Sequence, residues 1–232
     1  MKDFELMLAP MEGHSDPKFR ELCYKNGADS TFTEMARTSA LARGNKSTLE
    51  KIDIPNPIPT YIQIVGANEK ELTTFLQKFK PQKGFLGFNL NLGCPSPDIL
   101  QQGLGCALIK RTSKVRKIVQ TIKDAGYPVS IKLRLGMNQF EKEKKNYLNL
   151  IKAVDADFFI IHARHGKEKS QDSADFNVYE ECVQTNKVII ANGDIETKEQ
   201  IQHLKSIGVR GAMIGRAALK DPAIFNHLKT NF

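Results

Sequence analysis

The feature that most constrains the fold of this chain is a regular alternation of short apolar runs with helical patterns. The strand-like runs occupy residues 6–9, 30–33, 60–65, 85–92, 129–133, 158–161, 188–191 and 212–214. The helical patterns follow them, at residues 17–26, 36–43, 69–79, 113–125, 141–153, 177–185, 197–207 and 221–228. Such alternation is typical of a parallel sheet. Eight unbroken units predict an α/β fold, a closed (β/α)8 TIM barrel formed by residues 1–232 as a single domain.

The length and composition of the chain agree with one soluble domain. It has 232 residues, of which 41% are hydrophobic, and α/β barrels commonly run to about 250 residues. No apolar run reaches the ~20 residues that span a bilayer, and residues 1–5 carry acids where a signal peptide would be apolar. We therefore predict a cytoplasmic protein with no membrane partner. No glycine-rich phosphate loop follows the first strand, which argues against a Rossmann domain.

The cysteines and the net charge narrow the possible ligands. Cys23, Cys94, Cys106 and Cys182 lie far apart and form no Cys-x-x-Cys pair, so we predict no metal site and no disulfide framework. A net charge of +8 and a pI near 9.2 favour an anionic partner, most commonly a nucleic acid. Excess lysine also serves solubility, so charge by itself leaves RNA binding open.

One cysteine, Cys94, lies where an apolar strand gives way to a glycine- and proline-rich loop. Residues 85–92 are β-prone, and the glycine and prolines within 93–97 prevent the strand from continuing. A thiol on a stiff turn, three residues after the Asn91 amide, is well placed to react. The alternative is a small apolar plug, since free cysteine is among the most buried residue types.

Polar residues gather where each predicted strand ends. They are Glu34 after the second strand, Gln63 in the third, Asn91 and Cys94 at the fourth, Lys132 and Arg134 at the fifth, His162 and Arg164 after the sixth, Asn192 and Asp194 after the seventh, and Arg216 after the eighth. The first strand ends in Pro10 and Met11, and Gly215 follows the eighth. In a barrel these points converge on one face, which carries the active site.

The ends of the fifth and sixth predicted strands carry basic side chains suited to a cofactor: Lys132 and Arg134 at the fifth, and His162 after the sixth. Lys132 and Arg134 are two residues apart on a strand, so both can point toward the barrel mouth. A buried lysine there can hold negative charge or have a lowered pKa. The alternatives are an exposed pair on an edge strand and, for His162, a core histidine.

The sequence at the ends of the last two predicted strands resembles a phosphate-binding site. Backbone N–H groups after the last strands of a barrel favour an anion, and Gly193 and Gly215 permit close approach. Arg216 adds a fork of donors. A single phosphate suggests FMN, although phosphorylated substrates or two ordinary tight turns also explain the pattern.

Motifs that run in order along nearly the whole chain identify a family. The most specific are Asn91-x-Gly93-Cys94-Pro95 and Lys132-x-Arg134-x-Gly136. The other matching segments are 8–16, 19–20, 27–29, 33–35, 63, 103–105, 162–164, 191–195 and 213–217. In these segments the chain resembles the tRNA-dihydrouridine synthases, which are FMN-dependent (β/α)8-barrel flavoproteins.

The resemblance implies a redox cycle on tRNA. NADPH, or NADH, would reduce FMN, which then passes hydride to C6 of a uracil, while Cys94 protonates C5. The positions implied to hold FMN are Pro10, Met11, Gln63, Lys132, His162, Asn192, Gly193, Asp194, Gly215 and Arg216. Asn91 and Arg134 would face the uracil, and Arg164 would contact substrate. The target base must leave its stack, and basic surface that grips the RNA backbone offsets that cost.

The sequence departs from the family pattern in two places. Members usually carry a tyrosine and a glutamine in the loop after the histidine motif, whereas residues 168–172 here differ. Members also generally continue into a C-terminal helical domain that seats tRNA, so we interpret this chain as a short form.

Two other functions compete with this interpretation. They are an FMN enzyme acting on a free pyrimidine, as in dihydroorotate dehydrogenases, and a non-catalytic RNA-binding barrel. Intact Cys94, Lys132 and His162 argue against the latter.

Overall fold

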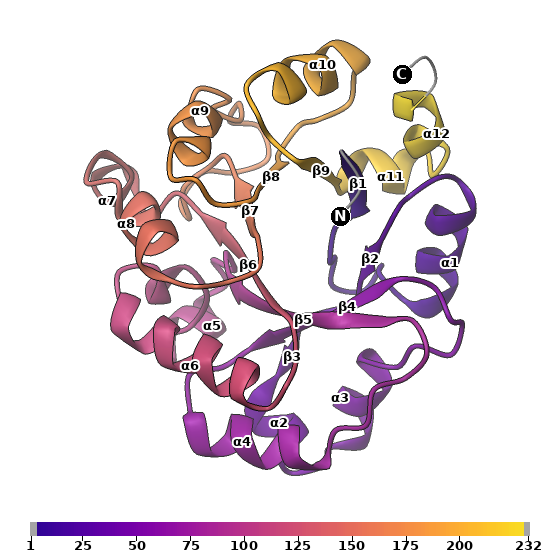
Figure 1. Cartoon of the computed structure of the whole chain (residues 1–232), viewed down its shortest axis with the longest axis vertical. Helices are drawn as coiled ribbons and strands as arrows, with labels where there is room; N and C mark the ends of the chain where they lie inside the picture. The colour runs from indigo at the N-terminus through magenta and orange to yellow at the C-terminus, as the bar shows by residue number, and fades with distance from the viewer. Residues whose placement is uncertain (1–3, 230–232) are drawn as a thin grey trace.

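A computed structural model describes residues 4–229, in which helices surround a barrel of parallel strands (Figure 1). The strands are β1 Glu5–Leu8, β2 Thr31–Phe32, β3 Ala36–Arg37, β4 Thr60–Val65, β5 Phe85–Leu92, β6 Val129–Arg134, β7 Phe159–His162, β8 Ile189–Asn192 and β9 Gly211–Ile214. The helices are α1 Pro17–Lys25, α2 Thr38–Ala42, α3 Lys46–Lys51, α4 Glu69–Lys78, α5 Pro97–Gln101, α6 Thr112–Asp124, α7 Gln139–Glu143, α8 Asn146–Ala153, α9 Val178–Val183, α10 Lys198–Ser206, α11 Arg216–Lys220 and α12 Ile224–Lys229, with a 3-10 turn η1 at Gly105–Leu108.

The sheet closes on itself, which confirms the predicted barrel. Its strands follow the order β1-β9-β8-β7-β6-β5-β4-β2, and the short β3 pairs with β4 outside this path. A parallel bridge between Met7 and Ser30 joins the two ends. Around it, the Leu8 N–H donates to Ser30 O (2.9 Å) and the Asp29 N–H donates to Leu6 O (2.7 Å). Within residues 4–229 no helix is long and apolar enough to cross a membrane.

Three predicted helices are wrong in their boundaries. The helix expected at 36–43 begins only at Thr38, because residues 36–37 pair as β3 with β4. The helix expected at 141–153 is divided into α7 and α8 by Lys145, whose φ of 52° is left-handed. The helix expected at 221–228 is α12, preceded by the unpredicted α11. Long-range strand pairing and a left-handed residue overrode the local pattern in the first two cases.

Alternate strand residues divide the core into two layers. One set faces the helices, and the other fills the barrel interior, where Met7, Phe32, Ile160 and Met213 form a separate cluster. Tyr61 stacks on Phe32 with ring centroids 4.9 Å apart. Toward the carboxyl ends of the strands this apolar filling gives way to amides.

The interior amides form a buried chain of hydrogen bonds across three strands. The Gln63 Nε2 donates to Asn89 Oδ1 (2.8 Å), and the Asn89 Nδ2 donates to Ser130 Oγ (2.9 Å). The Asn91 Nδ2 donates back to Gln63 Oε1 (2.9 Å). Each buried polar group thereby gains a partner, as a low-dielectric interior requires. This series of hydrogen bonds links the middle of the barrel to its mouth.

We expect Asn89→Ala to destabilise the protein by about 2–4 kcal/mol, since it leaves buried donors unpaired and opens a cavity. Equilibrium unfolding in urea measures this change. Asn149→Ala, at an exposed position of α8, is the control and should leave the free energy of unfolding nearly unchanged. Equal stability of the two variants would show that the amide chain contributes nothing.

Candidate active site

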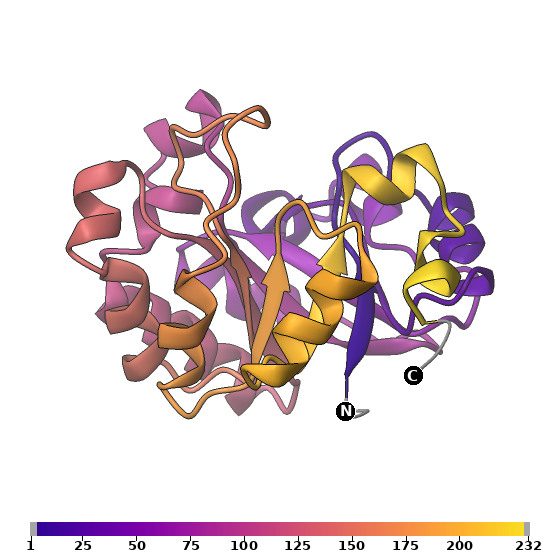
Figure 2. The ribbon, with the colours of Figure 1, turned by 90° about the horizontal axis from the view of Figure 1, so that it is seen from above.

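Two adjoining cavities open at the carboxyl ends of the strands, where loops rise beyond the sheet (Figure 2). One has a volume of about 310 Å³ and the other about 230 Å³. Both are lined by Pro10, Lys132, Arg134 and His162. The larger is also lined by Met11, Arg164, Asn192, Gly193, Asp194, Gly215 and Arg216, and the smaller by Gln63, Asn91 and Cys94. The structure thus brings all the predicted site residues to one face.

Cys94 lies in the smaller cavity on a turn fixed by Asn91. The Asn91 Oδ1 accepts hydrogen bonds from the backbone N–H groups of Gly93 (3.0 Å) and Cys94 (2.9 Å). The Cys94 Sγ is 3.5 Å from Ser96 Oγ. Among the four cysteines only Cys94 is incompletely buried, which argues against the apolar-plug interpretation.

Gly105 closes the other side of this turn. The Cys106 N–H donates to the Cys94 carbonyl oxygen (3.2 Å), which brings η1 against the Cys94 loop. A Cβ on Gly105, where φ is 58°, would lie 2.3 Å from that oxygen. Only glycine therefore permits this approach. Burial raises the pKa of the neighbouring Cys106 thiol to about 12, so that this second thiol stays protonated.

Lys132 is positioned by Asn192, which is held in turn by Tyr179. The Lys132 Nζ donates to Asn192 Oδ1 (2.7 Å), and the Asn192 Nδ2 donates to Met213 O (2.8 Å). The buried Tyr179 hydroxyl accepts from the Asn192 N–H (3.1 Å) and donates to the Asn192 carbonyl (2.8 Å). Both the side chain and the backbone of Asn192 are thereby fixed.

The site is electropositive and partly desolvated. Burial, with a smaller effect of the Arg134 charge, lowers the pKa of the Lys132 amine to about 7. Burial and the nearby cations, Lys132 foremost, lower the pKa of His162 far below its ordinary value. His162 is therefore neutral, and Lys132 can gain or release a proton near neutral pH.

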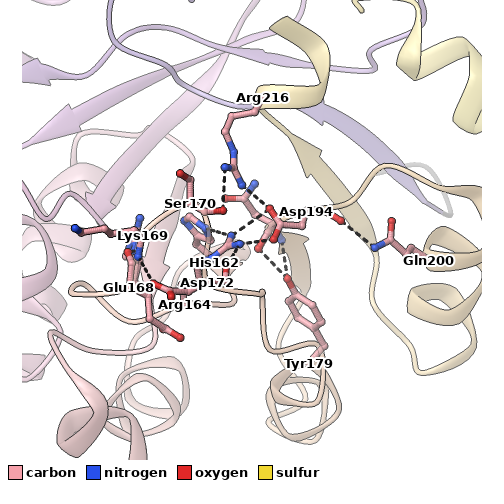
Figure 3. A network of polar contacts seen from close by, with 12 residues as sticks. His162, Arg164, Glu168, Lys169, Ser170, Asp172, Tyr179, Asp194, Gln200 and Arg216 are labelled. Atoms are coloured by element: carbon pink, nitrogen blue, oxygen red, sulfur yellow. Dashed lines mark hydrogen bonds and ion pairs between the residues drawn. The ribbon is translucent and has the colours of Figure 1, made fainter. Parts of the chain in front are cut away.

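A buried arginine, Arg164, organises the wall of the larger cavity (Figure 3). The residue is 1% exposed, and its guanidinium forms an ion pair with Asp194. Asp194 also accepts from Arg216 Nη2 (2.5 Å), so one carboxylate holds two guanidinium groups. The half-exposed Arg216 is thereby aimed along the cavity.

Three arginines hold the loop of residues 165–172 through its backbone carbonyl groups. Arg134 Nη1 donates to His165 O (2.8 Å) and Glu168 O (3.2 Å). Arg164 Nε donates to Asp172 O (2.7 Å), and Arg216 Nη1 donates to Ser170 O (3.2 Å). The three side chains come from the ends of β6, β7 and β9, so the loop is fastened to three parts of the rim.

Several predicted site residues form hydrogen bonds or ion pairs with other protein groups that the sequence did not reveal. The Asn91 amide holds the Cys94 turn and Gln63, and Asp194 holds two arginines. Arg164 holds Asp194 and the loop, and its predicted contact with substrate stays a prediction. The alternative of an exposed Lys132 and Arg134 pair on an edge strand is excluded, because β6 lies between β5 and β7.

Sequence reasoning missed Tyr179 and Glu141. The charged composition of residues 141–145 predicts a solvated helix face. This prediction is wrong for Glu141, which is 7% exposed and accepts from the Met137 N–H (2.9 Å). Asn138 caps α7 by accepting from the Glu141 N–H (3.0 Å), and an asparagine three residues ahead of a glutamate is a readable helix-start signal. No local sequence pattern identifies Tyr179 as a residue that positions the site.

No metal centre is evident in the described part of the chain. Within residues 4–229, no cluster of three or more histidine, cysteine or acidic side chains could hold a metal ion.

A sequence model of the dihydrouridine synthase (Dus) family matches residues 7–232. This chain belongs to that family. A Helicobacter pylori protein named "Probable tRNA-dihydrouridine synthase" is 31% identical, with 97% of this chain and 70% of the relative covered. The Pseudomonas putida "tRNA-dihydrouridine synthase B" is 29% identical over 97% of this chain and 67% of its own length. The chain therefore spans about two thirds to 70% of these relatives.

Solved structures of other enzymes share the fold. The N-(5'-phosphoribosyl)anthranilate isomerase of Pyrococcus furiosus has a TM-score of 0.55 at 13% identity and covers 97% of this chain and 96% of its own. A nitroalkane oxidase of Streptomyces ansochromogenes has a TM-score of 0.54 at 12% identity, with 91% and 65% covered. At such identities the likeness concerns the barrel alone.

We expect Tyr179→Phe to lower the free energy of unfolding by about 1–3 kcal/mol, because the buried Asn192 N–H and carbonyl lose their common partner. Urea unfolding measures the loss. Tyr24→Phe on α1, where the side chain is 40% exposed, is the matched control and should change little. A Tyr179→Phe protein as stable as the control would contradict the assigned role.

The lowered pKa of Lys132 predicts a pH dependence of stability in the flavin-free protein. Between about 7 and the ordinary lysine pKa of about 10.4, the unfolded chain binds a proton that the folded state lacks. Stability should therefore rise with pH across this window relative to Lys132→Met. Urea unfolding of both proteins at pH 7 and pH 9 measures the difference. A difference that does not change with pH would disprove the lowered pKa.

Proposed function

We propose that this protein is an FMN-dependent tRNA-dihydrouridine synthase that reduces the C5=C6 bond of uridine in tRNA. One observation carries the proposal: the only accessible thiol, Cys94, shares a small cavity with Lys132, Arg134 and His162. The names of the relatives agree with it, and that of a human relative, 28% identical, includes NAD(P)(+). NADPH or NADH is the proposed reductant, the cytoplasm the location, and residues 1–232 a single catalytic domain.

The residues of the larger cavity fit the phosphate end of FMN. Gly193 lines this cavity with φ 123°, and a Cβ there would lie 3.2 Å from His162 Cδ2, so glycine lets the turn after β8 pack closely against the His162 ring. Arg216 supplies guanidinium donors to a phosphate, and Gly215 precedes it at the end of β9. Asp194 contributes by orienting Arg216, since its own negative charge repels an anion.

The boundary between the two cavities fits the flavin ring. Pro10, Met11, Gln63, Lys132 and His162 surround this region. The Lys132 amine, when protonated, offsets negative charge at a ring edge, and neutral His162 can donate a hydrogen bond. FMN bound there supplies the hydride.

Cys94 supplies the proton. Hydride added at uracil C6 leaves an electron pair delocalised over C5 and the neighbouring carbonyl group, and a proton must reach C5 to complete the reduction. A cysteine thiol is largely protonated at neutral pH and can act as that acid. Asn91 fixes the turn that carries the thiol, and Arg134 borders the same cavity on the side of the predicted uracil site.

We expect Cys94→Ala to abolish dihydrouridine formation, by at least 100-fold as for loss of a general acid, while the purified protein keeps its flavin absorbance. Unmodified tRNA incubated with FMN, NADPH and each variant, followed by mass spectrometry of nucleosides, measures turnover. Cys182→Ala, at a buried cysteine of α9, is the control and should retain activity.

Three outcomes would overturn this proposal. Normal turnover by Cys94→Ala would remove the thiol from the mechanism. Reduction of orotate or free uracil but not of tRNA would favour the free-pyrimidine enzyme. A colourless protein that added FMN cannot restore would favour the non-catalytic RNA-binding barrel.

A further inference from the structure

Phe140 on α7 is unusually exposed for an aromatic side chain. It is 64% exposed, compared with 46% for Leu22, the next most exposed large apolar residue in the described part of the chain. Single exposed apolar side chains are common and need no explanation by themselves. The rigidity of its support and the charges around it make this one informative.

The backbone that carries Phe140 is fixed. Buried Glu141 accepts from the Met137 N–H (2.9 Å) and forms an ion pair with Lys110 (3.2 Å). Gly136 has φ 127°, and a Cβ there would lie 2.7 Å from Glu141 Cβ, so the preceding turn packs tightly on α7. The ring is therefore presented to solvent on a firm support.

Phe140 belongs to the rim of the active-site mouth. The turn after β6 joins Arg134, which lines both cavities, to α7 at the edge of the barrel (Figure 1). This turn is bonded to the 165–172 loop, because the Gly166 N–H donates to Gly136 O (2.8 Å) and the Lys167 N–H donates to Met137 O (3.1 Å). The same loop walls the larger cavity through Lys169 and Ser170.

Three exposed lysines on this rim, Lys144, Lys167 and Lys169, form no ion pair with an acidic side chain of residues 4–229. The Lys144 Nζ lies 5.6 Å from the centre of the Phe140 ring, and Lys167 and Lys169 extend from the neighbouring loop. By contrast, Lys142 and Lys145 on the same segment are paired with Asp175 and Glu181.

The acids of the rim are occupied locally. Glu143 accepts from Gln139 Nε2 (2.9 Å), Glu168 from the His165 N–H (2.5 Å) and Asp172 from the Lys169 N–H (2.7 Å). Each of these hydrogen bonds stays within its own helix or loop. None of these acids forms an ion pair with Lys144, Lys167 or Lys169 in the described part of the chain, so the three lysines are available to an external anion.

We propose that Phe140 is a stacking platform for an unstacked base of the RNA substrate, flanked by phosphate contacts from Lys144, Lys167 and Lys169. Single-stranded RNA is recognised by bases stacked on aromatic rings beside cations that follow the backbone. An apolar protein partner would not require the unneutralised lysines. This inference rests on the proposed tRNA substrate and adds to it a specific surface outside the catalytic cavity.

Binding of unmodified tRNA to the flavin-loaded protein at several salt concentrations tests the proposal. Phe140→Ala should weaken binding roughly 5- to 100-fold without changing the salt dependence, because stacking releases no counterions. Phe140→Trp, which keeps an aromatic ring for stacking, should bind tRNA more tightly than Phe140→Ala and about as tightly as the wild type. Lys167→Ala/Lys169→Ala should instead reduce the slope of log affinity against log salt by about one to two. Tyr24→Ala, at an exposed aromatic residue on α1, is the control and should bind like the wild type.

The outcomes separate this inference from the proposed function. Wild-type-like binding by Phe140→Ala, in a protein that makes dihydrouridine from tRNA, would overturn the stacking surface alone. A wild type that neither binds nor modifies tRNA would overturn both. If Phe140→Ala changes only the sedimentation behaviour of the protein, the ring serves a protein contact and the proposal is wrong.

Discussion

Closure of the parallel sheet between β1 and the segment that leads into β2 is the constraint on which the rest of the structure depends. The Met7–Ser30 bridge completes the circle, so the carboxyl ends of all the barrel strands meet at one rim. Strand register then decides which side chains are neighbours. Asn91 lies beside Lys132 in the register of β5 and β6, and His162 lies beside Asn192 in that of β7 and β8.

The buried polar groups of this rim form two connected systems. The amides of Gln63, Asn89 and Asn91 link the barrel interior to the Cys94 turn. The Arg164–Asp194 pair links the end of β7 to Arg216 and to the 165–172 loop. A buried guanidinium is costly to desolvate, and its ion pair and carbonyl partners offset that cost. Lys132, Arg134 and Arg216 line these cavities as basic side chains, which suits an anionic ligand.

The 165–172 loop contains residues 168–172, where the sequence is expected to depart from the family pattern, and backbone contacts hold this loop in place. The arginines hold the loop through backbone carbonyl oxygens, which every residue type provides. Glu168 and Asp172 stabilise it from within by accepting from backbone N–H groups. The loop is therefore fastened beside the larger cavity through its backbone carbonyl groups and stabilised by two of its own acidic side chains.

The sequence by itself determined the period of the elements, and with it the barrel and the polar residues at the strand ends, because alternation and turn chemistry are local properties. It also singled out Cys94 through the glycine and prolines around it. Only the tertiary structure decided that β3 pairs with β4, that Glu141 is buried, and that Tyr179 clasps Asn192. Those outcomes depend on hydrogen-bond partners brought together from separate elements, and packing rather than local pattern selects such partners.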